Sequence, residues 1–87
     1  HDAAPNPFNP MTVMSFELAR AGRALLTVYD VAGRRVAVLV DEHRDAGRHE
    51  VPWDGRNSQG RVSAAGVYFY RLEADGFTAT RRMTLVK

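Results

Sequence analysis

The sequence contains no cysteine, which excludes disulfide bonds and thiolate metal sites and leaves the redox compartment undetermined. No run approaches the roughly 20 apolar residues of a membrane span, and no signal-peptide pattern occurs. Lysine and arginine number 12 against 10 carboxylates and are scattered along the chain. A nucleic-acid-binding protein would gather its cations on one face. We therefore expect no membrane span and no nucleic-acid partner.

The candidate metal ligands lack the partners that a metal site needs. His1 could join His43 or His49 in a copper-binding brace, but no closely spaced histidine pair completes the site. Residues 54–60 resemble a calcium loop superficially, yet they offer one carboxylate where alternating acidic ligands are required. We expect a turn braced by side-chain caps there, and no cofactor.

Nucleophilic catalysis is also disfavoured by the sequence. Ser58 and Ser63 have no histidine or aspartate in a recognisable nucleophile setting. A chain of 87 residues also leaves little structure to spare for a deep cleft. We expect a non-enzymatic protein whose residues 1–87 form a single domain.

The stretch that organises the chain is Gly66–Leu72, which holds three aromatic and two aliphatic residues. Aromatic and β-branched side chains fit a pleated, buried surface. The stretch therefore predicts a strand that is covered on both faces and lies in the middle of a sheet. Trp53, at the end of an alternating segment through His49 and Val51, is expected to pack beneath it.

Further segments carry strand patterns, and the first of them shows strict alternation of buried and exposed types. These segments are residues 12–18, 24–30, 36–40, 48–53 and 77–86. Residues 1–10 hold three prolines and predict an extended lead-in, whereas residues 41–47 predict a polar loop. Pro52 cannot donate to a ladder, so its strand is expected at a sheet edge or to leave the ladder there.

Short strands, frequent turn signals and the absence of helical periodicity are typical of an antiparallel β-sandwich of the immunoglobulin or fibronectin type III class, here with about seven strands. A small barrel is the alternative architecture. The large apolar residues of the strands predict the core. The expected core residues are Phe16, Leu26, Val28, Trp53, Tyr68, Tyr70 and Leu72.

An ordered set of motifs spans nearly the whole chain. The set comprises Asn6-Pro7-Phe8-Asn9-Pro10, Phe16-Glu17-Leu18, Val28-Tyr29-Asp30-Val31-Ala32-Gly33-Arg34, Gly47-Arg48-His49, Trp53-Asp54-Gly55 and Gly66-Val67-Tyr68-Phe69-Tyr70-Arg71-Leu72. Together these motifs resemble the Ig-like domain found at the C-terminal end of many secreted bacterial proteins. That family overlaps the flagellar hook-cap (FlgD-like) Ig-like domains and the type A C-terminal sorting domains of the type IX secretion system.

The resemblance implies a β-sandwich that is appended to a catalytic or adhesive protein, recognised in the periplasm by the export machinery and delivered to the cell surface or medium. It predicts a non-catalytic C-terminal accessory module that serves in secretion sorting, cell-surface attachment or assembly. The implied partners are proteins: the secretion machinery, the parent protein or neighbouring copies of the domain.

We expect the recognition surface at the two ends of the chain, because the middle strands are committed to the core. Its expected residues are Asn6, Pro7, Phe8, Asn9, Arg81, Arg82 and Lys87. Two alternatives remain open. A carbohydrate-binding module would expose Trp53, Tyr68 and Tyr70 as a flat stacking platform. A self-assembling extracellular structural subunit would add residues 3–10 to an open sheet edge.

Overall fold

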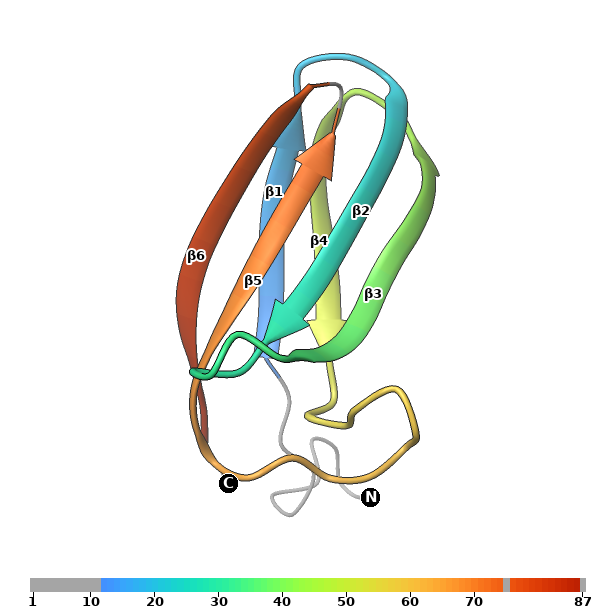
Figure 1. Ribbon diagram of the computed structural model, residues 1–87. Coiled ribbons are helices and arrows are strands. Elements are labelled where there is room, and N and C mark those ends of the chain that lie inside the picture. Colours follow the sequence, from blue (N-terminus) through green and yellow to red (C-terminus); the bar gives the residue numbers. More distant parts are fainter. Residues whose placement is uncertain (1–11, 75, 87) are drawn as a thin grey trace, which may run out of the picture.

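The computed structural model describes residues 12–74 and 76–86. The described strands are β1 (Thr12–Leu18), β2 (Gly22–Tyr29), β3 (Arg35–Arg44), β4 (Gly47–Trp53), β5 (Gly66–Ala74) and β6 (Phe77–Leu85). They form two antiparallel sheets, β1–β4 and β3–β2–β5–β6, which lie one behind the other in Figure 1. The predicted antiparallel sandwich is confirmed, with six described strands where about seven were expected. The lead-in predicted for residues 1–10 lies outside the described residues.

The core lies between the two sheets and is built from alternate residues of their strands. Met14, Leu26 and Trp53 are at most 1% exposed, and Leu85 closes the end of β6 at 1%. The structure buries six residues of the expected core, which are Phe16, Leu26, Val28, Trp53, Tyr68 and Leu72. Tyr70 is partly buried and packs against this cluster. Burial of this kind is the main favourable term in folding such a small domain.

β5 lies between β2 and β6, in the middle of its sheet, as its composition predicted. The expectation that both of its faces are covered was wrong. Val67 is 38% exposed, and Phe69 and Arg71 are only half-buried. The reason is the two-layer architecture: the second sheet covers one face of the four-stranded sheet, so alternate residues of β5 point outward. The middle strands therefore do present side chains on the surface.

The polar loop predicted for residues 41–47 was also wrong, because β3 continues to Arg44 and β4 begins at Gly47. The polar residues pair with the start of β2, where Leu25 lies opposite Asp41. β3 is an edge strand, so its solvent-facing positions accept charged side chains without breaking the ladder. The Arg23 guanidinium pairs with the Asp41 carboxylate across these two strands.

Pro52 lies in β4, whose hydrogen-bonded neighbour among the described strands is β1 alone. Pro52 is paired with Val13 in that ladder. The prediction of an edge position therefore agrees with the structure. None of the described residues belongs to a helix that is long and apolar enough to cross a membrane.

Candidate functional site

Several residues considered for metal binding brace a loop or a strand, whereas His1 lies outside the described residues. Asp54 accepts a hydrogen bond from the Arg56 N–H at 3.0 Å, and the Asn57 side chain accepts from the Arg61 N–H at 3.0 Å. His49 stacks on Phe16 with ring centroids 5.2 Å apart. Within residues 12–74 and 76–86, no group of three or more His, Cys, Asp or Glu side chains is placed to hold a metal ion.

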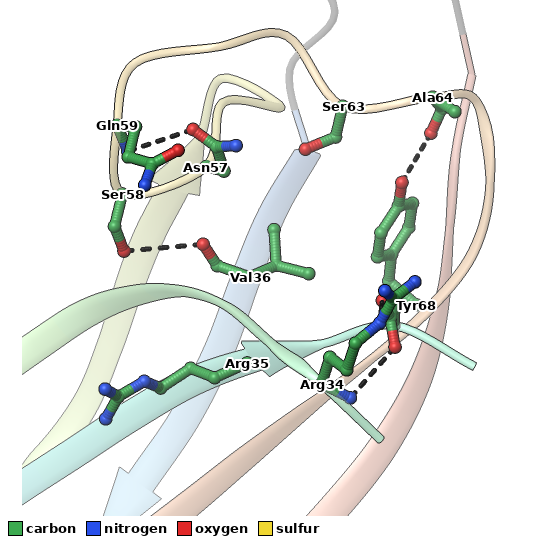
Figure 2. Close-up of a pocket in the computed structure, with 10 residues that line it drawn as sticks. Arg34, Arg35, Val36, Asn57, Ser58, Gln59, Ser63, Ala64 and Tyr68 are labelled. Atoms are coloured by element: carbon green, nitrogen blue, oxygen red, sulfur yellow. Dashed lines mark hydrogen bonds and ion pairs between the residues drawn. The ribbon is translucent and has the colours of Figure 1, made fainter. Parts of the chain in front are cut away.

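A hollow of about 480 Å³ lies at the end of the sandwich where the turn at residues 30–34 and the start of β3 meet the loop at residues 57–64 (Figure 2). Polar groups of its lining hold the loop against two strands. The Ser58 N–H donates to the Val36 carbonyl of β3 at 3.0 Å, and the Tyr68 hydroxyl of β5 donates to the Ala64 carbonyl at 2.6 Å. Ser58 and Ser63, the two serines without a triad partner in the sequence, line this hollow. The arrangement braces the loop that crosses between the sheets.

Asp30 at the mouth of this hollow organises the turn between β2 and β3. Its carboxylate accepts hydrogen bonds from the Arg34 N–H at 2.9 Å and the Ala32 N–H at 3.0 Å, and it pairs with the Arg34 guanidinium at 3.1 Å. The backbone hydrogen bond from Arg34, followed by the charge of its guanidinium, holds the pKa of Asp30 below its ordinary value of 3.8. Gly33 completes the turn at φ 83°, a conformation that glycine adopts without strain.

Trp53 and Tyr68 do not form a stacking platform. Trp53 is 1% exposed, and its ring meets the Tyr68 ring edge-on, with centroids 5.4 Å apart and planes at 74°. A carbohydrate-stacking surface needs exposed, roughly coplanar rings. The carbohydrate-binding interpretation therefore has no support from these aromatics.

An aromatic and arginine cluster lies on the outer face of the four-stranded sheet, around Tyr29, Phe69 and Arg71. The Arg71 guanidinium donates to the Tyr29 hydroxyl at 2.8 Å and lies 5.0 Å from the centre of the Tyr29 ring. Its Nε atom is buried and makes no hydrogen bond with the described residues, although the Glu73 carboxylate lies 3.5 Å away. A shallow hollow of about 380 Å³ opens beside the cluster, with Val31, 73% exposed, at its rim.

Sequence reasoning missed this cluster because it assigned both faces of β5 to the core. The signal that could have found it is the alternation itself: Tyr29 follows the core residue Val28, and Phe69 and Arg71 flank Tyr70. Register pairs Tyr29 with Phe69, so the outward residues of β2 and β5 gather on one face.

The expected recognition residues fall into two groups. Arg81 and Arg82 are exposed on β6, where Arg82 lies opposite Phe69 and therefore on the same outer face as the aromatic and arginine cluster. Arg81 lies opposite Tyr70 and points to the inner side of the sheet. The others, Asn6, Pro7, Phe8, Asn9 and Lys87, lie outside the described residues, as do residues 3–10 of the self-assembly alternative.

The two sheets, their antiparallel connections and the loop-bracing tyrosine define an Ig-like β-sandwich domain. The model of the family described as FlgD Ig-like domain matches residues 8–76, and the chain belongs to that family. Among solved structures, the crystal structure of FlgD from P. aeruginosa is 26% identical to this chain, with a TM-score of 0.71. The match covers 86% of this chain and 59% of that one, so the matched part spans less than two thirds of that protein. No curated protein matches the sequence.

Proposed function

We propose that this domain is a non-catalytic accessory module of a larger secreted bacterial protein, and that it acts by docking to another protein. The role includes assembly, cell-surface attachment or secretion sorting of the parent, with delivery through the periplasm to the surface or medium. Membership of the FlgD Ig-like family, whose domains are non-enzymatic, supports the accessory role. The similarity to FlgD favours assembly within this group of roles.

The observation that carries the docking role is the aromatic and arginine cluster of Tyr29, Phe69 and Arg71. Tyrosine, phenylalanine and arginine are enriched at the centres of protein interfaces, where they supply large contact areas. Arg71 is already held over the Tyr29 ring. A partner would therefore meet a guanidinium that is oriented before binding, which reduces the cost of ordering it.

Arg82 extends this surface toward the edge strand β6. The proposed docking surface therefore contains Arg82, which the sequence predicted for the recognition surface, together with residues from the middle of the chain. Scattered cations on such a face favour a docking contact shaped by the fold over a purely electrostatic tag.

A reporter fused ahead of the domain, in a host that possesses the type IX machinery, tests the proposal. We expect delivery to the surface or medium with the intact domain, and a loss of about tenfold with Arg71→Gln, equivalent to about 1.4 kcal/mol of docking free energy. Arg48→Gln is the matched control, because Arg48 lies on β4 in the other sheet and pairs with Glu50. Thermal denaturation of both variants would establish that they are equally folded.

Equal delivery with and without the whole domain would contradict the sorting role and leave a role in assembly or attachment. Equal delivery by the intact domain and Arg71→Gln would instead remove the aromatic and arginine cluster from the docking surface.

A further inference from the structure

The two sheets differ in width, and this leaves part of one inner face uncovered by the described strands. Neighbouring strands lie about 4.8 Å apart, so a two-stranded sheet cannot cover a four-stranded one. In Figure 1, β1 crosses behind β5 on the side of β4 that faces β6, and β6 extends past it. On the opposite side, the loop around Ser58 closes against Val36 of β3. The uncovered part therefore lies beneath β6.

The burial of β6 agrees with this arrangement. Register places Ala79 opposite Leu72 and Arg81 opposite Tyr70, so these β6 residues share the inner face of the sheet. Leu72 is 4% exposed, whereas Ala79 and Arg81 are exposed, and Phe77 keeps 45% of its surface accessible. The inner face of an edge strand is thus open over about half of its length.

The edge of β1 beside this open face is free within the described part of the chain. β1 pairs with β4 from Thr12 to Leu18, and no described strand pairs with its other side. An unpaired edge presents a row of N–H and C=O groups that can accept another strand. Natural edges are commonly protected by lysine or proline, but β1 contains neither and carries Glu17 as its one charged residue.

We propose that the free edge of β1 and the open inner face of β6 form one acceptor groove, which binds an extended segment of a partner protein as an added strand. Main-chain hydrogen bonds to β1 would supply affinity, and alternate side chains would supply specificity. Apolar side chains fit against Ala79 and Phe77, and a carboxylate fits Arg81, which forms no ion pair within the described residues. The inference rests on the proposed docking role and names the chemistry of its partner.

A single strand fits this groove better than a folded second copy. β6 extends past β1, so an intact sheet approaching the free edge of β1 would bring its own covering strands against β6 (Figure 1). The lead-in of this chain is also a poorer match, because it carries Pro5, Pro7 and Pro10. N–H groups alternate between the two sides of a strand, so in either register at least one position facing β1 would lack its donor.

The probe is a nine-residue peptide of alternating valine and threonine, with glutamate replacing the middle valine and a lysine at each end. Titration into the isotope-labelled full chain should shift amide resonances of β1 and β6 and slow hydrogen exchange in β1. A peptide with proline at both the threonine and the valine that follow the glutamate is the control. N–H groups alternate between the two sides of a strand, so one of the two prolines faces β1 in either register and breaks the ladder.

Two variants of β6 sharpen the test. Ala79→Glu places a negative charge inside the groove beside Arg81, where it competes with the peptide glutamate, and should weaken peptide binding by about tenfold or more, equivalent to about 1.4 kcal/mol. Thr78→Glu changes the neighbouring residue, which points to the opposite face, and should leave the dissociation constant within about twofold of its original value.

The absence of binding, or resonance shifts confined to β3, would overturn the proposal. Protection of the free β1 edge in the unbound chain by its own residues 1–11, or a dimer formed through β1, would also overturn it. The reporter experiment remains separate. If the peptide does not bind but Arg71→Gln loses delivery, the acceptor groove is ruled out and the docking role remains. If the peptide binds but delivery does not depend on the domain, the sorting role is ruled out and the acceptor groove remains.

Discussion

At the residue scale, Trp53 joins the two sheets through its ring and ties β4 to the following loop through its nitrogen. Its ring packs edge-on against Tyr68, and its indole N–H donates to the Arg56 carbonyl at 2.9 Å. Trp53→Ala should lower the free energy of unfolding by about 3–5 kcal/mol, because it removes buried surface and leaves a cavity. Urea denaturation would measure the change. Val86→Ala, at a residue that is 70% exposed, should stay within about 0.5 kcal/mol. An unchanged midpoint in Trp53→Ala would contradict this packing.

The lowered pKa of Asp30 links stability to acid. A carboxyl whose pKa is lower in the folded state contributes stability above its ordinary pKa of 3.8, and the contribution is lost as pH falls through the folded pKa. The melting temperature should therefore decrease below about pH 4, and Asp30→Asn should show a smaller decrease over that interval. Calorimetry between pH 7 and pH 2.5 would compare them. Glu50→Gln, at an exposed carboxylate paired with Arg48 on the same strand, is the control. Parallel curves for the parent and Asp30→Asn would rule out this linkage.

Side-chain identity was informative about these residues because burial and capping follow local rules. Large apolar residues at alternate positions indicated the core, and residues 54–60 indicated a turn braced by side-chain caps. The outward cluster at Arg71 was not predicted. Its guanidinium lies over Tyr29 only because two strands distant in the sequence become neighbours, and no local pattern reports that pairing.

At the scale of the strand and its turn, two glycines make a matched comparison. Gly33 has φ 83° and Gly22, at the start of β2, does not adopt positive φ, yet a Cβ at either position would meet nothing within 4 Å. Gly33→Ala should cost about 1–2 kcal/mol through backbone strain alone. Gly22→Ala should be neutral or slightly stabilising, because alanine reduces the entropy of the unfolded chain. Equal destabilisation of the two variants in chemical denaturation would show that φ does not determine the cost of adding a Cβ at these positions.

At the scale of the strand, the sequence predicted the position of a strand in its sheet better than the residue at which a strand ends. β5 was assigned to the middle of a sheet because aromatic and β-branched residues concentrate in it, and that placement is confirmed. The sequence pattern predicted that β3 ends at Val40, because the last residues of the strand are polar. Polarity marks exposure, and an edge strand is exposed on one face and one side, so hydrophobicity alone cannot separate its end from a loop.

At the scale of the whole molecule, the sandwich class followed from short strands separated by turns without helical periodicity, and it is confirmed. The division of the strands into sheets of two and four was not predicted. It depends on which strand edges find each other, a property of the folded chain as a whole. The candidate acceptor groove is a consequence of that division and therefore could not be found from the sequence.

The pairing of β1 with β4, and of β2 with β5, also sets the order of events during synthesis. Thr12 pairs with Trp53, and Val28 pairs with Tyr70, so each ladder waits for a segment that leaves the ribosome much later. Chains dominated by such distant pairings fold slowly, on a scale of about milliseconds to seconds. β2 can pair with the adjacent β3 early, but its ladder with β5 can form only when translation of the domain is almost complete.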